Sequence, residues 1–311
     1  MRIAVLGAGG IGGYYGALLA KAGHDVVFVA RGAHLEALQR RGLTIRAADG
    51  DLTLPVTAVA QVEGVEPVDL VLFCVKAYDT EAAARSIAPL VARDTLVLTV
   101  QNGLDRAQTI AATLGGTGGS VLAATVYAAL QLAEPGVVVR TGGESRIVFG
   151  ERDGAGSERT ERLAAVFRQS GIVHEIAADI ERVLWEKFLF ITGIGGVTAL
   201  ARAGIGAIRD SPEGRALLVA SCAEIVAVAR AEDAPLRPEA AAAALAQADT
   251  LPGRWRSSMA RDLEDGRRLE VDALSGAVVQ RGHRSGVPTP VHQTITACLS
   301  VQQPAAAATR T

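Results

Sequence analysis

The sequence predicts an α/β protein, with a doubly wound parallel sheet in the first part of the chain and an all-helical domain after it. Up to about residue 175, short β-branched runs alternate with helical patterns. Buried strands separated by helices form parallel sheets with both faces covered. From about residue 179 strand patterns almost disappear, and apolar residues recur at helical spacing. We therefore predict two domains, residues 1–178 and 179–311.

Each predicted element follows from such a run or pattern. The predicted strands are RIAVLG (2–7), DVVFVAR (25–31), DLVLFCV (69–75), LVLTV (96–100), SVLAATVY (120–127), GVVVRT (136–141) and RIVFG (146–150). The first two predicted helices run from about Ile11 to Ala22 and from His34 to Arg40. In the second domain, Ser211-Pro212 and Arg237-Pro238 are helix start signals. The tail from about residue 302 has nothing to bury, so we expect it to be frayed.

The composition favours a soluble, cytoplasmic protein that binds a small molecule. A net charge of −2 and a pI near 6.2 provide no basic face for nucleic acid or for an anionic membrane surface. The apolar run over residues 3–20 is too rich in glycine for a signal or membrane helix. The cysteines are widely separated, as reduced core thiols are. The histidines show no metal-binding spacing, so we expect no metal.

A glycine-rich turn follows the first predicted strand. Gly7, Gly9 and Gly12 fit the pattern G-x-G-x-x-G, and Gly10 and Ile11 complete the turn and open the helix. Glycines permit a tight turn and a close approach of backbone N–H groups to a pyrophosphate, and the helix N-terminus adds positive potential. Because a second strand follows and ends about 18 residues later, we interpret the turn as a dinucleotide site rather than a purely structural one.

The end of the second strand indicates which dinucleotide binds. An NAD site usually has an acid there that accepts from the ribose 2′-hydroxyl, but this chain has Ala30 and Arg31, with no carboxylate before Glu36. A guanidinium holds a 2′-phosphate in fork geometry. We therefore predict NADP as the cofactor; the alternative is that Arg31 is a solvated loop residue. We expect nearby His34 to be an exposed residue at a helix start.

Two further strands end in polar residues. Lys76 follows DLVLFCV and Asn102 follows LVLTVQ. Both fall at the carboxyl edge of the sheet, where open α/β sheets bind ligands. Either residue alone is often an ordinary strand-terminal residue. Together with the glycine turn, they outline a crevice for the nicotinamide half of the cofactor.

One lysine stands in an apolar stretch of the second domain. Residues 185–196 read WEKFLFITGIGG, so Lys187 lies between a tryptophan and an apolar run with no obvious polar partner. An ammonium can stabilise negative charge and supply a proton. From the residues alone, the simpler interpretation is that Lys187 extends its stem along apolar surface and that Glu270 is a solvated helix residue.

Taken together, these motifs resemble the ketopantoate reductase (2-dehydropantoate 2-reductase) family. The motifs are GAGGIG, Arg31, CVKAYDT, TVQNGL, WEKFLF followed by TAL, and SSMARDLEDGRRLEVD, and the resemblance runs from Met1 to about Leu299. It implies a Rossmann-type NADP domain, an all-helical domain and an active site in the cleft between them. The implied activity is the NADPH-dependent reduction of ketopantoate, a 2-oxo acid, to pantoate in pantothenate biosynthesis.

The resemblance also implies roles for individual residues. Lys187 matches the family's catalytic lysine, which donates a proton to the carbonyl oxygen. Glu270 matches the acid that interacts with the substrate and catalytic groups, and Ser258 matches a substrate-binding serine. Lys76 and Asn102 match residues near the nicotinamide ribose and the substrate.

The chain departs from the family at two positions. Biosynthetic members carry substrate-contacting asparagines four and eight residues after the catalytic lysine, on the same helical face, whereas this chain has Ile191 and Gly195. We expect a more apolar substrate pocket there, because the amides are missing. We also expect Gly193, Gly195 and Gly196 to make the pocket roomier and to break or kink the helix.

Three interpretations of the function follow. The chain is a ketopantoate reductase, a paralogous NADPH-dependent reductase for a different, less hydroxylated carbonyl, or a sensor that binds NADP(H) without turnover. Retention of Lys76, Asn102, Lys187, Ser258 and Glu270 argues against a sensor, which needs no proton donor. We expect the long apolar helix over 211–232 to pack between domains or between subunits, so a homodimer is one expected assembly.

Overall fold

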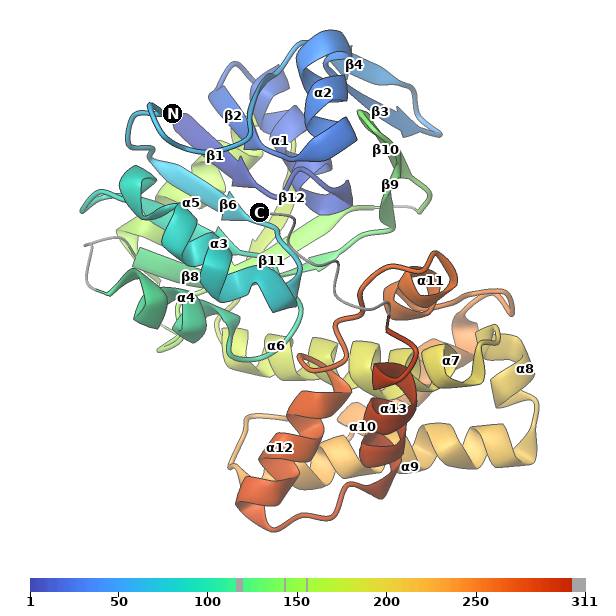
Figure 1. Cartoon of the computed structure of the whole chain (residues 1–311). Helices are drawn as coiled ribbons and strands as arrows, with labels where there is room; N and C mark the ends of the chain where they lie inside the picture. Colours follow the sequence, from blue (N-terminus) through green and yellow to red (C-terminus); the bar gives the residue numbers. More distant parts are fainter. Residues whose placement is uncertain (116–119, 143, 155, 304–311) are drawn as a thin grey trace. The chain divides into compact units, whose positions relative to one another are not determined.

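The computed structural model describes residues 1–115, 120–142, 144–154 and 156–303 (Figure 1). These residues fall into two compact units. The first comprises Met1–Gln101 and Asp105–Ile180, and the second comprises Asn102–Leu104 and the chain from Glu181 onward. The tail predicted to fray falls, beyond residue 303, outside the described residues.

The first unit is the α/β part of the chain, and every predicted strand is present in it. The strands are β1 (Arg2–Leu6), β2 (Asp25–Val29), β3 (Leu43–Ala47), β4 (Leu52–Leu54), β5 (Thr57–Val59), β6 (Leu70–Phe73), β7 (Leu96–Thr99), β8 (Ser120–Tyr127), β9 (Leu130–Glu134), β10 (Val137–Arg140), β11 (Arg146–Gly150) and β12 (Val173–Ile176). The α-helices are α1 (Gly10–Lys21), α2 (Gly32–Arg41), α3 (Thr80–Ser86), α4 (Arg106–Leu114) and α5 (Glu158–Gln169). Short 3₁₀ turns, η1 (Ala77–Asp79) and η2 (Ala88–Leu90), flank α3.

Among the described residues, eight strands form the main sheet, in the order β12-β11-β8-β7-β6-β1-β2-β5. Neighbouring strands are parallel except β11 and β8, where Phe149 lies opposite Ala124 in an antiparallel register. The sheet is therefore mixed rather than purely parallel. The chain runs outward from β1 to β2 and β5 and then returns to β6, so the topological switch point lies between β1 and β6.

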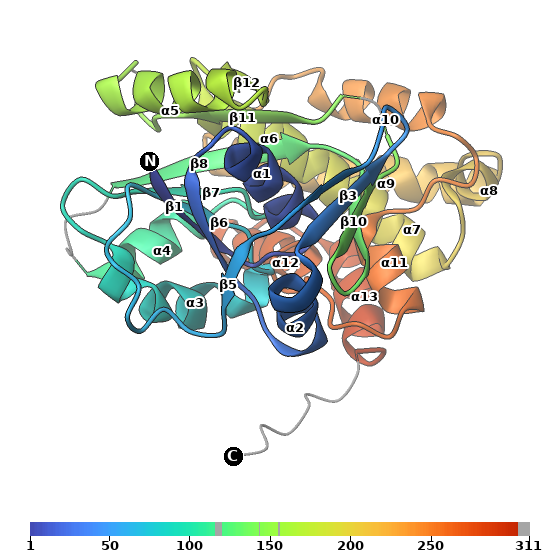
Figure 2. The same cartoon turned by 90° about the horizontal axis from the view of Figure 1, so that it is seen from above.

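Both faces of the main sheet are covered, as a doubly wound fold requires. Neighbouring residues along a strand point to opposite faces. Ile3 of β1 belongs to a buried cluster with Tyr15 of α1, whereas the next residue, Ala4, belongs to a second cluster with Ile110 of α4. Near one edge, α5 packs beside β12 (Figure 2). The predicted class, an α/β domain followed by helices, is confirmed.

The described residues also form a second sheet, of four strands, which the sequence did not predict. Its order is β4-β3-β10-β9. In this sheet Val138 of β10 pairs in parallel with Ile45 and in antiparallel with Leu132. The strands LTIRA and LTL are too short and too polar to stand out from a loop. The strand predicted over 136–141 therefore belongs to this sheet and not to the main one.

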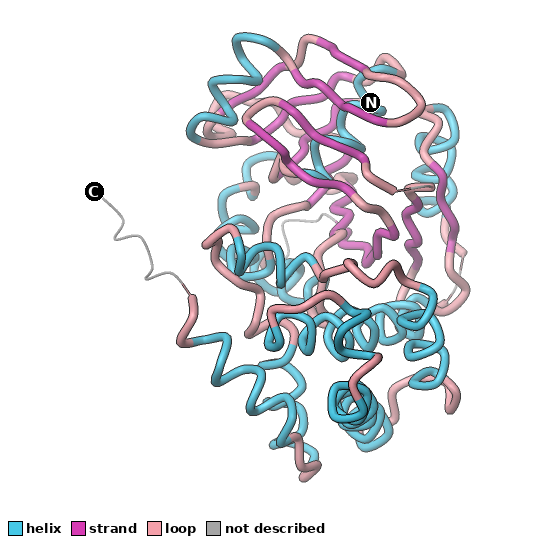
Figure 3. Tube along the Cα trace, turned by 90° about the vertical axis from the view of Figure 1, so that its right-hand side faces the viewer, coloured by secondary structure: helices cyan, strands magenta, loops and turns pink. Residues whose placement is uncertain are grey.

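The second unit is helical, and the part of it that the structure describes contains no strand (Figure 3). Its helices are α6 (Ile180–Leu189), the π segment η3 (Phe190–Ile194), α7 (Gly195–Ala201), α8 (Ile205–Arg209), α9 (Pro212–Ala231), α10 (Ala240–Thr250), α11 (Ser258–Glu264), α12 (Ser275–Ser285) and α13 (Pro290–Ser300). Ser211 caps α9 as predicted, because its hydroxyl accepts from Gly214 N–H at 3.1 Å. The predicted start at Arg237-Pro238 forms a turn, and α10 begins only at Ala240.

α6, the π segment and α7 form one helical stretch, Ile180–Ala201, so of the break or kink predicted in ITGIGG the break is wrong, and the kink stays a prediction. A π turn takes the place of the break. The stretch is long and apolar enough to cross a membrane, but 67% of its apolar window is buried inside the protein. Such burial is typical of a core helix.

Candidate active site

Two glycines of the turn after β1 have no room for a side chain. Gly7 has a φ of +94°, and a Cβ on it would lie 2.9 Å from Val75 N. A Cβ on Gly12 would lie 2.2 Å from the carbonyl oxygen of Gly7. The turn is therefore tight and packs closely against the chain that follows β6, as the G-x-G-x-x-G pattern predicts.

Gly9 is the glycine that faces open space. Apart from Gly9 and its two chain neighbours, no atom of the described residues lies within 4 Å of the position its Cβ would take. Gly9 is also the N-cap residue of α1, where unpaired N–H groups and the helix dipole favour an anion. Gly10 instead faces the backbone of Leu130 in β9, and Ile11 is half-buried. The turn thus fits the pyrophosphate of a dinucleotide at Gly9.

His34 lies in the first turn of α2, as predicted, but it is half-buried rather than exposed and supports the glycine turn. Its Nε2 lies 2.8 Å from Ala8 O, and its Nδ1 accepts from Gly136 N–H at 2.9 Å. Because a carbonyl only accepts and an amide N–H only donates, a single neutral tautomer satisfies both bonds. Desolvation of the half-buried ring lowers the pKa of His34, which favours this neutral form. The ring ties the glycine turn to the β9–β10 hairpin.

Arg31 follows β2 at the position predicted to select the cofactor. Its side chain is 89% exposed, and its Nη2 lies 3.3 Å from Asp79 Oδ2. Asp79 lies in η1 after β6, so the pair links the carboxyl ends of two strands that both flank β1. The acid that follows Arg31 in the sequence, Glu36, pairs with Arg40 instead. An exposed guanidinium held at this edge suits a 2′-phosphate.

Lys76 and Asn102 follow β6 and β7, at the carboxyl edge of the sheet, and both are half-buried. Gln101 joins these two strand ends. Its Nε2 donates to Val75 O and to Thr80 Oγ1, each at 2.9 Å. Because Gln101 is buried, these bonds fix the backbone on either side of the predicted crevice. Asn102 itself groups with the second unit.

Lys187 lies on a helix that aromatic side chains anchor in the second unit. Trp185 and Phe188 are buried and meet edge to face, with ring centroids 5.9 Å apart. The guanidinium of Arg281 lies 5.4 Å from the Trp185 ring and pairs with Glu232. Desolvation by burial lowers the pKa of Lys187 to about 8. The ammonium is therefore still protonated at neutral pH but loses its proton more readily than an ordinary lysine.

The helix changes from α to π just after Lys187. The π segment begins at Phe190, and α7 resumes at Gly195. π turns are rare and occur frequently at functional sites. Because a π turn holds more residues than an α turn, positions four and eight after Lys187 do not share one face as regular helical spacing predicts. Ile191 is half-buried like Lys187, whereas Gly195 is fully buried.

The glycines of ITGIGG do not make a pocket roomier, and this prediction was wrong. A Cβ added to each glycine would lie too close to a side chain from a distant part of the chain. The distance would be 2.9 Å from Gly193 to Cys222 Sγ, 3.1 Å from Gly195 to Ser257 Cβ, and 3.2 Å from Gly196 to Ser275 Oγ. These partners belong to α9, to the cap of α11 and to α12. The glycines therefore let other segments approach the helix that carries Lys187.

Ser258 and Glu270 lie in the same unit as Lys187. Ser258 is the first residue of α11 and is exposed, whereas Ser257 before it is buried and caps the helix. Glu270 lies between α11 and α12 and is only 7% exposed, so it is not a solvated helix residue. A carboxylate is rarely buried without a specific partner or role.

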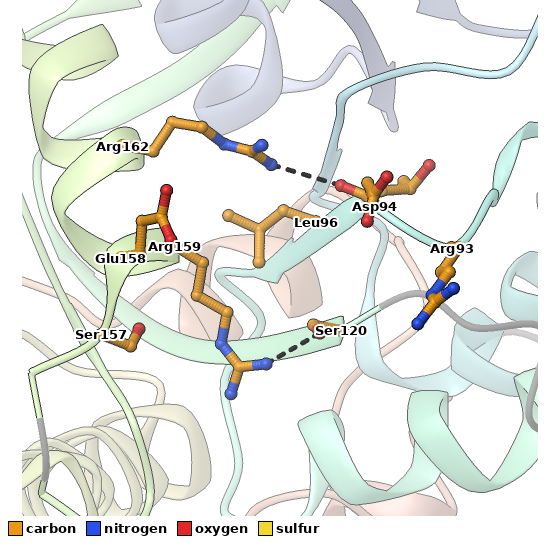
Figure 4. Close-up of a pocket in the computed structure, with 9 residues that line it drawn as sticks. Arg93, Asp94, Leu96, Ser120, Ser157, Glu158, Arg159 and Arg162 are labelled. Atoms are coloured by element: carbon orange, nitrogen blue, oxygen red, sulfur yellow. Dashed lines mark hydrogen bonds between the residues drawn. The ribbon is translucent and has the colours of Figure 1, made fainter.

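A cavity of about 490 Å³ opens in the first unit, at the opposite edge of the sheet from the glycine turn (Figure 4). Its lining includes Leu96 and Ser120, the first residues of β7 and β8, and the first turn of α5. Around it Arg162 donates to Asp94 O and Arg159 to Ser120 Oγ. Ligands of open α/β sheets bind at the carboxyl ends of the strands, so we do not assign this cavity to the site.

Two family profiles match most of the chain. Residues 3–154 match the profile described as ketopantoate reductase PanE/ApbA, and residues 179–303 match the profile of the ketopantoate reductase PanE/ApbA C terminal. The chain belongs to the ketopantoate reductase family. The resemblance seen in the sequence is thereby confirmed.

Individual relatives agree with membership of the ketopantoate reductase family. A 2-dehydropantoate 2-reductase from Halobacterium salinarum is 34% identical over 297 residues, which covers 95% of this chain and 96% of the relative. An uncharacterized oxidoreductase from Bacillus subtilis is 30% identical, with 97% and 99% covered. The crystal structure of a family ketopantoate reductase from Ralstonia eutropha matches with a TM-score of 0.89 at 34% identity, covering 97% of this chain and 98% of that one.

The sequence did not predict a functional role for three residues that support the candidate site of this ketopantoate reductase family member. They are His34, Gln101 and Ser257, and the hydrogen bonds that tie them to other elements span 21 to 102 residues of the chain. Gln101 and Ser257 each directly precede a predicted site residue, which is the signal that could have drawn attention to them.

Proposed function

We propose that this chain is an NADPH-dependent reductase that converts a 2-oxo acid to a 2-hydroxy acid, with ketopantoate as the substrate. The observation that carries the proposal is the environment of Lys187. Its ammonium is half-buried on an anchored helix, and burial lowers its pKa to about 8. Such a group suits proton donation near neutral pH. Family membership and the relatives named as 2-dehydropantoate 2-reductases support the substrate class.

The proposed roles follow from the chemistry of the reduction. Bound NADPH supplies the hydride that reaches the carbonyl carbon of the substrate. Lys187 stabilises the negative charge that develops on the carbonyl oxygen and donates its proton there. We assign Ser258 and Asn102 to hydrogen bonds with the substrate, and Glu270 to contacts with the substrate and the catalytic group. With these donors in place, the substrate carbonyl is oriented before hydride arrives.

We assign cofactor binding to the first domain, residues 1–178, and the catalytic and substrate groups to residues 179–311 together with Asn102. Gly7, Gly9, Gly10, Ile11 and Gly12 form the pyrophosphate turn, and the open space at Gly9 supports this assignment. Arg31 is assigned to the 2′-phosphate, supported by its exposure beside Asp79. Lys76 and Asn102 are assigned to the nicotinamide half. We place the enzyme in the cytoplasm, with a homodimer as the proposed assembly.

A different 2-oxo acid is the second candidate substrate, and one observation favours it. Ile191, four residues after Lys187, is half-buried and offers no hydrogen bond. A site that lacks a hydrogen-bonding group at this position favours a substrate with fewer hydroxyls. Gly195 does not add to this argument, because it is buried against Ser257.

Steady-state kinetics with a panel of 2-oxo acids test the proposal. We expect NADPH oxidation to be most efficient with ketopantoate, and kcat/KM to be higher with NADPH than with NADH. A higher kcat/KM for another 2-oxo acid would transfer the proposal to that substrate. Tight NADPH binding without turnover of any 2-oxo acid would refute the enzyme and favour a sensor.

The cofactor assignment has its own matched pair of variants. Arg31→Ala should raise the KM for NADPH about tenfold or more and leave that for NADH unchanged, because it removes one charged hydrogen bond to phosphate. Arg40→Ala is the control, since Arg40 is also exposed and ion-paired but lies near the far end of α2. Equal efficiency with NADH and NADPH in the unmodified enzyme would refute the assignment of Arg31.

A further inference from the structure

The segment that precedes α11 lies along the π segment and contacts both ends of it. At the first end, the Trp255 ring lies 5.9 Å from the Phe190 ring. At the other end, Ser257 Oγ donates to Gly195 O at 3.0 Å. The π segment between these contacts begins three positions after Lys187 in the sequence. The helix of the proposed proton donor is therefore held from outside at the place where its geometry changes.

The Ser257 hydroxyl bonds in two directions at once. It donates to Gly195 O, and it accepts from Ala260 N–H at 3.1 Å as the N-cap of α11. Thr198 Oγ1 lies 3.0 Å from Ser257 Oγ and 2.9 Å from Gly195 O, which closes a triangle of polar atoms. Ser257 is 7% exposed and Thr198 is fully buried. Loss of a bond in such a place leaves a buried polar group unsatisfied.

Hydroxyl groups of other segments bond to the end of the π segment and to its junction with α7. The π pattern of hydrogen bonds is rare and is found mostly as a single turn inserted in an α-helix. Here hydroxyl groups from elsewhere in the chain bond to its carbonyls. Ser221 Oγ donates to Gly193 O at 3.1 Å, and Ser257 Oγ donates to Gly195 O at the junction with α7. Ser221 belongs to the long core helix α9, whereas Ser257 stands next to a proposed substrate residue, Ser258.

We propose that Ser257 is a positioning residue of the reductase, whose hydroxyl fixes the start of α11, with Ser258, to the helix that carries Lys187. This inference rests on the proposed function. One hydroxyl thereby sets the substrate-binding serine and the proton donor relative to each other. A displacement of about 1 Å between such groups costs up to about a hundredfold in rate.

The test compares Ser257→Ala with Ser211→Ala. Ser211 is a matched control, because it caps α9 in the same unit through the same kind of bond, at 3.1 Å to Gly214 N–H, and precedes by ten residues Ser221, the α9 residue that bonds to the π segment. We expect both variants to lose thermal stability, and Ser257→Ala to lose more, because it also removes a buried bond to Gly195 O. Only Ser257→Ala should lower kcat with the 2-oxo acid, by about tenfold to a hundredfold, while the Kd for NADPH stays unchanged. Ser257→Thr, which keeps the hydroxyl, should recover most of kcat.

A second readout does not depend on turnover. The pH dependence of Lys187 acetylation by acetic anhydride, followed by mass spectrometry, reports the environment of the ammonium. We expect its midpoint to move to higher pH in Ser257→Ala and to stay in place in Ser211→Ala. If Ser257→Ala does not fold, Thr198→Val carries both measurements, with smaller changes in the same direction.

The outcomes separate the two claims. An active enzyme in which Ser257→Ala matches Ser211→Ala in kcat and in Lys187 acetylation would overturn the positioning role alone. Absence of turnover in the unmodified protein would overturn the proposed function. The acetylation shift would then still show whether Ser257 sets the environment of Lys187.

Discussion

Two glycine-rich segments of the chain, the turn after β1 and the ITGIGG segment after Lys187, use glycine in opposite ways. In the turn, Gly7 adopts a positive φ and Gly9 faces open space beside a helix N-terminus. In ITGIGG the backbone stays helical, and Gly193 lies against Cys222. The turn leaves room for a ligand, whereas ITGIGG leaves room for neighbouring helices. Glycine content alone therefore does not indicate a pocket.

The turn should be the more sensitive of the two segments to a methyl group. We expect Gly12→Ala to weaken NADPH binding by more than about a hundredfold, because the new Cβ would lie 2.2 Å from the backbone oxygen of Gly7 and overpacking against backbone is costly. Fluorescence titration with NADPH measures the change. Gly9→Ala is the control for folding, since its Cβ has open space, and it should melt like the unmodified protein.

Hydroxyl groups and a histidine support ITGIGG, so acid should weaken this segment. Fully buried His292 bonds through Nε2 to Ser221 O at 3.0 Å, and Ser221 Oγ in turn holds Gly193 O. Desolvation lowers the pKa of His292 to about 4, although the bond to the Ser221 backbone raises it. Glu224, the nearby acid, accepts from the backbone N–H groups of Val291 and His292. The neutral imidazole is therefore the form that the fold requires.

The sign of the pH effect follows from this lowered pKa. In the unfolded chain the imidazole takes up a proton near pH 6.5, whereas in the folded chain it does so only near pH 4. The stabilisation is complete above pH 6.5 and is lost as the pH falls to 4, by about 2–3 kcal/mol. Urea unfolding at several pH values measures this loss. In His292→Asn the loss should be smaller by that amount, and an equal loss in both proteins would contradict the account.

The smallest expected effect is a methyl group in ITGIGG. Gly193→Ala should lower the free energy of unfolding by about 1–2 kcal/mol, because the contact with Cys222 Sγ at 2.9 Å outweighs the better helix propensity of alanine. Cys222→Ala in the same chain should recover part of the loss, since it makes room for the methyl group. The Kd for NADPH should not change. Weaker NADPH binding with an unchanged free energy of unfolding would contradict this account, because it would show that ITGIGG leaves room for a ligand, as the glycine turn does.

The elements of the fold were predictable where a run of residues carried a local pattern. β1, the glycine turn and α1 could be predicted from RIAVLG and GAGGIG. The apolar run of the strand, the backbone φ that the glycines permit and the start of the helix are all set by residues close together in the sequence. The second sheet was not predictable, because β3 and β4 are short, and β3 gains its other partner from β10, far along the chain. The antiparallel register of β11 likewise depends on a partner strand and not on its own sequence.

The residues of the candidate site likewise fall into those that the sequence could predict and those that it could not. Lys187 and the glycine turn stand out in the sequence because their residue types are unusual for their surroundings. Ser257 and His34 do not, because a serine or histidine acquires its role only from partners such as Gly195 O and Ala8 O. The π turn was also invisible, since the glycines of ITGIGG were compatible with a break and the hydroxyls that hold it come from other helices.

The central claim is that Lys187 donates the proton, and the pH dependence of kcat/KM for ketopantoate tests it most directly. Because the ammonium is the active form and its pKa is lowered to about 8, kcat/KM should be level near neutral pH and fall as the pH rises through 8. Lys187→Ala should lose about a hundredfold or more in kcat while it still binds NADPH. A profile that stays level well above pH 8, or an alanine variant with unchanged turnover, would contradict the account.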